Sequence, residues 1–296
     1  MSWVRPLLNF YLRLTEKPYL RKVTDIIAAR KSFERKSSLF FYPPKSARFS
    51  EDKIDDVPVL WVNEDEAKGP IVLYLHGGAY VFGSSRTHSA LVARLMRDTV
   101  GAACLPDYRL APENVFPAAL EDAMKLYRSL LESRRLIFIG GDSAGGGLAL
   151  ALLHCICVQG LPQPAGVFAF SPLTDCTFSG DSIKRNAVAD VMLPAQRSGD
   201  MVRFYLGDHD PLDPGVSPLF GKFDGACPVW LTAGDTEILC DDTTRMAQRL
   251  QAQGVRVEVK IERDLPHVWP IFHNILPEGR HTLRVLARWI NSLADS

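Results

Sequence analysis

The sequence lacks the features that place a chain across a membrane or around a metal. Its 296 residues include no run of about 18 apolar residues, so we expect no transmembrane helix. The amino-terminal stretch has neither a long apolar core nor a small-residue cleavage site, which argues against a signal peptide. No spacing of cysteine and histidine matches a zinc site. We therefore expect a protein that needs neither a metal nor a cofactor.

The sequence also has no excess of positive or negative residues. The 34 lysines and arginines balance 34 aspartates and glutamates, so the formal net charge is zero. Without a net field, we expect no recruitment of nucleic acid or anionic membranes and no stable membrane insertion. The cysteines are scattered along the chain, at Cys104, Cys155, Cys157, Cys176, Cys227 and Cys240. This scatter favours free buried thiols in a reducing compartment, so we expect a cytoplasmic protein.

The first 35 residues have a helical pattern. Apolar side chains recur there near the helical period, with basic residues between them. Two interpretations compete, namely an amphipathic helix on a membrane surface and a lid packed over the rest of the protein. Glu16 and Asp25 interrupt the basic face, and this favours the lid.

Beyond Pro43 and Pro44, predicted strands and helices alternate. The predicted strands are residues 57–62, 70–75, 101–105, 136–139, 164–170, 228–233 and 255–261. The predicted helices include residues 87–99, 117–131, 148–158, 194–206 and 278–294. This alternation predicts an α/β fold with a mostly parallel sheet and ligands at the carboxyl ends of its strands. The last strand, 255–261, alternates apolar and polar residues as an edge strand does.

One stretch organises the prediction of a site. Gly141-Asp142-Ser143-Ala144-Gly145 links a buried strand to a helix, with Ser143 at the apex of a very tight turn. Side chains at the two flanking glycine positions would clash in so sharp a turn. The competing interpretation is a phosphate-binding turn, which would need its glycines before the helix and usually a lysine. No lysine lies in this stretch.

Two further stretches precede the serine. His76-Gly77-Gly78-Ala79 follows a buried strand, and its backbone N–H groups are candidates to receive an oxyanion. Taken alone it is equally a plain strand–loop turn, but a serine turn downstream favours the oxyanion interpretation. The loop at 106–113 carries Asp107 and Arg109. We interpret these two as an ion pair that pins the loop rather than as catalytic groups.

A serine hydroxyl needs a base to take its proton and a carboxylate to orient that base. In a fold of this kind the chain order is serine, acid, histidine. Ser143 comes first, Asp235 or Glu237 follows the penultimate strand, and His267 follows the last one. The residues themselves leave the choice between the two acids open.

The motifs at residues 76–79, 107–119 and 141–146 together resemble those of the hormone-sensitive-lipase-like esterases (bacterial family IV) of the α/β-hydrolase fold. The resemblance extends from about residue 55 onward. It implies a serine carboxylic ester hydrolase with a helical cap, forming an acyl-enzyme on short- to medium-chain esters. We accordingly expect a cap segment at residues 1–45, a catalytic domain at 46–296 and a cap insertion at about 176–213.

The resemblance also assigns roles to single residues. Ser143 would be the nucleophile, His267 the base and Glu237 the acid, although relatives usually carry aspartate at that position. The expected oxyanion donors are the N–H groups of Gly77, Gly78 and Ala144. Ala79 stands where many relatives carry a third glycine, so we do not carry over the activity on tertiary-alcohol esters that is associated with the three-glycine form. We expect Phe82 and Trp269 to line the substrate pocket.

Several activities share this machinery. A lactone hydrolase, an amidase or a deacetylase would use the same three side chains. A non-catalytic receptor on the same fold, such as the gibberellin receptors, would have lost the histidine, whereas His267 is present. The strand at Val255–Ile261 and the C-terminal helix are candidates for a homodimer contact, because an exposed edge strand invites pairing.

Overall fold

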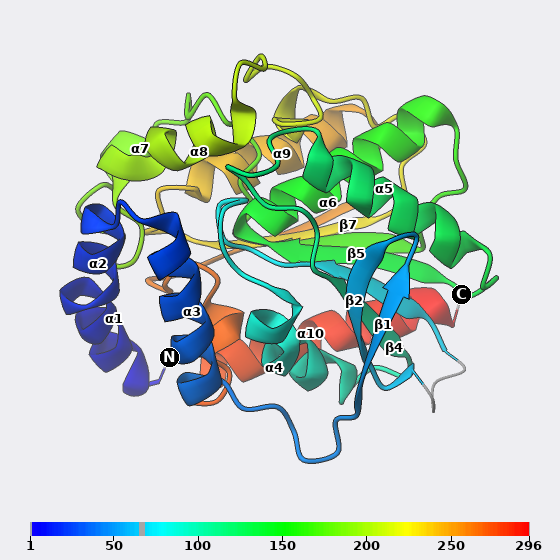
Figure 1. Ribbon diagram of the computed structural model, residues 1–296, viewed down its shortest axis with the longest axis horizontal. Helices are drawn as coiled ribbons and strands as arrows, with labels where there is room; N and C mark the ends of the chain where they lie inside the picture. Colours follow the sequence, from blue (N-terminus) through cyan, green and yellow to red (C-terminus); the bar gives the residue numbers. More distant parts are fainter. Residues whose placement is uncertain (1, 65–68, 296) are drawn as a thin grey trace.

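The computed structural model describes residues 2–64 and 69–295. In that part of the chain one sheet contains eight strands, in the order β1-β2-β4-β3-β5-β6-β7-β8 (Figure 1). Their bounds are β1 (Phe49–Ile54), β2 (Val57–Val62), β3 (Ile71–Leu75), β4 (Ala102–Pro106), β5 (Ile137–Asp142), β6 (Gly166–Phe170), β7 (Val229–Gly234) and β8 (Val257–Glu262). Strand β2 pairs antiparallel with both β1 and β4, and all pairings from β4 to β8 are parallel. The predicted α/β fold and mostly parallel sheet are confirmed.

Helices cover both faces of this sheet. Helices α4 (Ser85–Met96) and α10 (Pro277–Ala294) pack on one face, and α5 (Ala118–Leu131), α6 (Ser143–Gln159) and α9 (Cys240–Ala252) pack on the other (Figure 1). Successive side chains of a strand point to opposite faces, so the central strands feed two cores. In β3, Leu73 joins the α5–α6 side and Tyr74 the α4–α10 side. A central strand must therefore be apolar at every position, as the sequence is.

The remaining helices gather at one end of the molecule. Helices α1 (Val4–Leu14), α2 (Glu16–Lys22) and α3 (Ile26–Phe40) form its left edge in Figure 1, and α7 (Ser182–Arg185) and α8 (Ser198–Leu206) lie next to them. Short 3₁₀ helices complete the chain at Ala195–Arg197, Pro218–Phe220 and Trp269–Phe272. The side chain of Asp25 accepts a hydrogen bond from the N–H of Ala28 at 2.9 Å and so caps α3. None of the helices in the described residues has the length and apolar content needed to span a bilayer.

Two details differ from the sequence-based expectation. Strand β1 was not predicted, because its polar residues carry no burial signal and it pairs only with β2 at the sheet edge. Asp107 and Arg109 both brace the loop but not by pairing with each other. Asp107 accepts a hydrogen bond from the N–H of Ser85 at 2.7 Å, whereas Arg109 forms an ion pair with Asp122 at 2.8 Å. The sequence spacing of Asp107 and Arg109 could not show whether they pair with each other or with two different partners.

Arg30 fastens α3 to the loops beneath it. Its Nε donates to the carbonyl of Val81 at 2.7 Å, and one terminal nitrogen donates to the carbonyl of Ala111, also at 2.7 Å. The guanidinium also pairs with Glu113 at 2.7 Å. One side chain thus holds α3 against two loops that follow strands of the sheet.

Replacement of Arg30 by alanine should lower the free energy of unfolding by about 1–3 kcal/mol, because two carbonyl groups lose a charged donor. Urea denaturation measures this change. Lys31 is the matched control, since it is the next residue of α3, is exposed, and has no partner in the described residues. Its replacement by alanine should change stability by less than about 0.5 kcal/mol. Equal effects of the two substitutions would refute the role given to Arg30.

Candidate active site

Ser143 lies at the junction of β5 and α6, in the left-handed backbone region with φ of 53°. A non-glycine residue takes this conformation only where its surroundings hold it there. The turn is crowded, because a Cβ atom at Gly141 would lie 2.4 Å from the carbonyl oxygen of Gly145. A Cβ at Gly145 would lie 2.1 Å from the carbonyl oxygen of Leu75. The steric reason predicted for both glycines therefore holds, and the serine is held at the tip of a rigid turn.

A buried carboxylate and imidazole lie beyond the carboxyl ends of β7 and β8. Nδ1 of His267 is 2.7 Å from Oε2 of Glu237, and both side chains are almost fully buried. An ionised carboxylate can only accept, so Nδ1 carries the proton and Nε2 of the neutral ring is left as a base. Burial by itself would lower the pKa of His267, but the hydrogen bond and charge of Glu237 raise it above 6.5 overall.

The other carboxylate oxygen of Glu237 is also held. Oε1 accepts hydrogen bonds from Oγ of Ser171 at 2.8 Å and from the N–H of Gly234 at 2.5 Å. Ser171 Oγ in turn accepts the N–H of Val268 at 3.2 Å, which ties the loop that carries the histidine to the same serine. A buried carboxylate is tolerated only when donors satisfy it in this way.

Asp235, the alternative acid, is in a different environment. Its side chain is exposed and accepts the N–H of Asp264 at 2.7 Å. Asn186, from the predicted cap insertion, donates to the backbone carbonyls of Asp235 and Glu237 at 2.9 and 2.8 Å. The geometry thus brings Glu237, and not Asp235, to His267.

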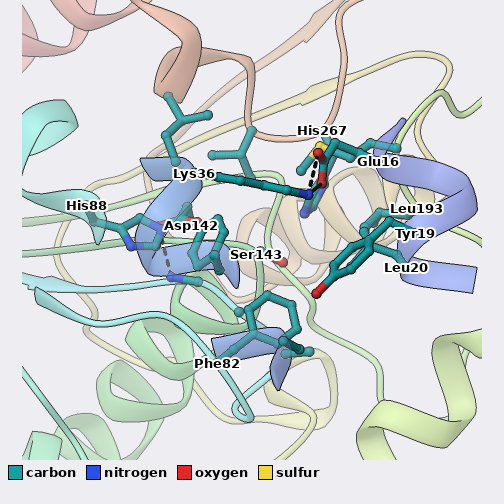
Figure 2. A pocket seen from close by; sticks show the side chains of 18 of the residues that line it. Glu16, Tyr19, Leu20, Lys36, Phe82, His88, Asp142, Ser143, Leu193 and His267 are labelled. Atoms are coloured by element: carbon teal, nitrogen blue, oxygen red, sulfur yellow. Dashed lines mark hydrogen bonds and ion pairs between the residues drawn. The ribbon is translucent and has the colours of Figure 1, made fainter. Parts of the chain in front are cut away.

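Ser143 and His267 line the same cavity, whose side chains are shown in Figure 2. No hydrogen bond joins these two residues within the described parts of the chain. Such contacts are often long in a substrate-free enzyme and tighten in the complex. The serine and the histidine therefore face one cavity, and the carboxylate of Glu237 is hydrogen-bonded to the histidine behind it.

The loop after β3 differs from expectation at one position. The N–H of Gly77 donates to Oδ1 of Asp142 at 3.1 Å, so it is already occupied by a protein acceptor. The expectation that Gly77 supplies an oxyanion donor is corrected on this ground. The N–H groups of Gly78 and Ala79 donate to no protein group in the described residues. Ala144 lies in the first turn of α6, where backbone N–H groups lack intrahelical acceptors.

Asp142 is a site residue that sequence reasoning missed. Besides Gly77, its carboxylate accepts the hydroxyl of Tyr74 at 2.8 Å and lies 3.4 Å from Nε2 of His88. Burial would raise the pKa of this carboxyl, but the charge and hydrogen bond of His88 and the hydroxyl of Tyr74 hold it below its usual range. A charged residue at the end of an otherwise apolar strand was the available signal.

His76 shapes the same loop, as expected. Its ring stacks on Tyr108 with a centroid distance of 4.3 Å, and the Tyr108 hydroxyl donates to the His76 carbonyl at 2.6 Å. Nδ1 of His76 lies 2.8 Å from the carbonyl of Gly77. Burial and the charge of nearby His88 lower the pKa of His76 to about 3, so this ring is neutral near pH 7.

The two predicted pocket residues have different outcomes. Phe82 lines the cavity beside Ser143 (Figure 2). Trp269 does not, and this expectation is wrong. Its indole is fully buried in the core on the α10 side, where Nε1 donates to Thr282 at 3.0 Å. Its position two residues after His267 suggested proximity, but the chain turns inward at Val268, which has φ of 51°.

The amino-terminal helices and the segment expected to be a cap insertion supply the rest of the cavity wall. The lining residues from α2 and α3 are Glu16, Tyr19, Leu20, Ala29, Phe33 and Lys36, and the insertion adds Met192 and Leu193. Glu16 and Lys36 form an ion pair of 2.7 Å within this wall (Figure 2). In residues 2–64 and 69–295, no cluster of three or more His, Cys, Asp or Glu side chains is placed to hold a metal ion.

Comparison with known proteins matches residues 72–271 to a family model described as the alpha/beta hydrolase fold. An acetyl-hydrolase of Streptomyces hygroscopicus is 36% identical over 236 residues, which cover 78% of this chain and 79% of that protein. A putative acetyl-hydrolase, LipR, of Mycobacterium tuberculosis is 34% identical over 248 residues, covering 81% and 79%.

Solved structures agree with these relatives. A crystal structure of an esterase from the bacterial hormone-sensitive lipase family superposes with a TM-score of 0.92 at 31% identity and covers 99% of both chains. The resemblance drawn from the motifs is confirmed by these matches.

The hydrogen bond between Glu237 and His267 predicts a pKa effect. Replacement of Glu237 by glutamine removes its negative charge, so the pKa of His267 should fall, since burial is then opposed only by the charges of Asp190 and Asp142. NMR titration of the imidazole measures the shift. The matched control is Asp235→Asn, which should leave the pKa of His267 unchanged. A drop in Asp235→Asn but not in Glu237→Gln would reverse the assignment of the acid.

Proposed function

The chain belongs to the hormone-sensitive-lipase-like group of the α/β-hydrolase family and is a carboxylic ester hydrolase, in which we propose that Ser143, His267 and Glu237 form the catalytic triad. The observation that carries this proposal is the buried 2.7 Å contact between His267 and Glu237 at the cavity that contains Ser143. The same contact argues against a non-catalytic receptor, which would have no use for an oriented base.

The proposed reaction has two halves. Oγ of Ser143 attacks the ester carbonyl while His267 takes the hydroxyl proton. The alcohol then leaves with that proton. Water repeats the sequence on the acyl-enzyme and releases the acid. We assign the oxyanion to the N–H groups of Gly78, Ala79 and Ala144, because Gly77 donates to Asp142. Loss of one such donor typically raises the barrier by about 3 kcal/mol.

Asp142 has a positioning role in this proposal. Its carboxylate fixes the loop of the oxyanion donors through Gly77 and is itself fixed by Tyr74. It also precedes the nucleophile directly in the chain. One buried group therefore sets the distance between the attacking oxygen and the donors that receive the new charge.

Two cavities that meet at Ser143 support an ester as the substrate, and we propose short- to medium-chain acyl groups for it. A second apolar cavity, lined by Leu173, Phe178, Val202 and Ile238, also reaches Ser143 and shares Leu20, Ala79, Phe82 and Leu193 with the first. An ester has two arms, so we assign one cavity to the acyl group and the other to the alcohol. Side chains of α2 and of the 176–213 insertion line both cavities, and α3 lines the first, which is why we propose that these segments form the cap.

We place the enzyme in the cytoplasm because all six cysteines are free and four of them are buried. We further propose a homodimer through β8 and α10. Strand β8 is the last strand of the sheet, and its Val259 and Ile261 are exposed apolar residues on an unpaired edge.

Hydrolysis of p-nitrophenyl esters from acetyl to palmitoyl tests the catalytic proposal. Turnover should be highest for short chains, and Ser143→Ala should lower kcat by about 10⁴- to 10⁶-fold because the nucleophile is lost. Glu237→Gln should lower kcat by roughly 10²- to 10⁴-fold, and Asp235→Asn should stay near the wild-type rate.

Because only the neutral imidazole accepts a proton, activity of the wild type should fall as the pH drops through the raised pKa of His267.

Two outcomes would contradict this proposal. Equal turnover by the wild type and Ser143→Ala would exclude the serine as nucleophile. A folded wild type that hydrolyses lactones or amides but no linear ester would move the substrate class to those compounds, with the same three side chains.

Sedimentation equilibrium tests the dimer. We expect twice the chain mass of 32.9 kDa and a return to the single-chain mass in Ile261→Lys, because a lysine on the edge strand opposes pairing. A wild type that sediments at 32.9 kDa at every concentration would rule out this interface.

A further inference from the structure

Helix α1 has an apolar face that the protein does not cover. Trp3, Leu7, Phe10 and Leu14 recur three or four residues apart and are 77, 58, 64 and 60% exposed. The opposite face carries Leu8 and Leu12, which are buried in the core. A surface helix normally presents polar residues to solvent, whereas the solvent-facing side of α1 presents apolar ones. A contiguous exposed patch of this kind marks an interaction site.

The patch continues into an apolar groove between α1 and α3. Trp3, Leu7 and Tyr11 line the groove from α1, and Phe40 lines it from the end of α3. Tryptophan and tyrosine beside aliphatic side chains are typical of elements that lie at a lipid–water boundary. The patch lies at the edge of the molecule formed by the first three helices (Figure 1).

Charge distinguishes this end of the molecule from the rest. Residues 1–48 contain eleven lysines and arginines against three acidic residues, whereas residues 49–296 contain 23 against 31. Five basic side chains of the first segment are exposed and have no partner in the described residues, namely Arg21, Lys22, Lys31, Arg35 and Lys45. The neutral total therefore conceals a strong asymmetry between the amino-terminal segment and the rest of the chain, which the net charge alone does not report.

The same asymmetry argues against a second copy of this chain as the occupant. Two patches facing each other would bring together two segments with an excess of positive charge, which repel. A lipid surface with anionic headgroups offers an apolar layer for the exposed face of α1. It also offers negative charge for the basic side chains around that helix.

The groove is also continuous with the catalytic cavity. Six side chains line both, namely Glu16, Phe33, Lys36, Phe41, Met192 and Phe272. The wall between the groove and the cavity therefore consists of the Glu16–Lys36 ion pair, three aromatic rings and one methionine. An acyl chain leaving a lipid layer along α1 would meet this wall next. This step of the argument rests on the proposed function, whereas the exposed patch and the charge do not.

We propose that the outer face of α1, with the basic side chains of α2, α3 and the following loop, docks on the surface of an anionic lipid bilayer. The contact is peripheral and involves no spanning segment. The two interpretations of the amino-terminal pattern are then both realised, because the inner face of α1 packs as part of a lid and its outer face meets lipid.

Vesicle flotation of the Ser143→Ala protein tests docking without involving catalysis. The protein should float with vesicles of phosphatidylcholine mixed with phosphatidylglycerol, and much less with phosphatidylcholine alone or at raised salt. Phe10→Glu combined with Leu14→Glu should lower the bound fraction about tenfold or more. Lys31→Glu combined with Arg35→Glu should also lower it, and only with the anionic vesicles.

The matched control is Val100→Glu combined with Val158→Glu, at positions 75 and 61% exposed and outside the basic segment. It adds the same charge to the protein and should leave flotation unchanged. Thermal unfolding midpoints of all variants report whether the fold is kept, and Phe10 and Leu14 are exposed enough for their replacement to be tolerated.

The proposal is overturned if the Ser143→Ala protein, whose surface is otherwise unchanged, fails to float with anionic vesicles. It is also overturned if the Phe10/Leu14 variant floats as well as the control. A dimer that dissociates in the Phe10/Leu14 variant, without any flotation, would assign the patch to a second copy of the chain. Hydrolysis of water-soluble esters in the absence of lipid reports on the proposed function separately, so the failure of one does not imply the failure of the other.

Discussion

The buried hydrogen bond between Glu237 and His267 is the interaction on which the site depends. A carboxylate out of water is tolerated only if donors surround it. Here the donors come from different segments, with Ser171 following β6, Gly234 ending β7 and His267 following β8. These positions meet only because the three strands are parallel neighbours, so the sheet order is a precondition of the chemistry.

A second buried carboxylate, Asp142, organises the opposite side of the cavity. It links the end of β5 to the loop after β3 through Gly77, and Tyr74 and His88 keep it ionised. In the proposed mechanism the two carboxylates have separate roles, since Glu237 orients the base and Asp142 holds the backbone that receives negative charge. Neither group is exposed to solvent, which preserves both contacts from competition with water.

The cap joins the site to the outer surface. Its second helix and third helix close the cavity, while Arg30 and Asn186 tie cap segments to loops that bear on the site. The first helix uses its inner face for packing and leaves an apolar outer face beside the same wall. The proposed closure of the site and the proposed contact with a lipid surface therefore both involve the first three helices.

Local sequence pattern was enough to predict the fold class, the serine turn and the chain order of the three proposed triad residues, because strand alternation, steric crowding at glycine positions and motif spacing are local properties. The residues alone did not determine which acid hydrogen-bonds to the histidine. Asp235 and Glu237 are two residues apart, and the tertiary structure decides which of their side chains reaches His267. Sequence reasoning also missed β1, the occupation of the Gly77 N–H by Asp142, and the burial of Trp269. Each of these depends on contacts between segments distant in the chain, which local pattern cannot report.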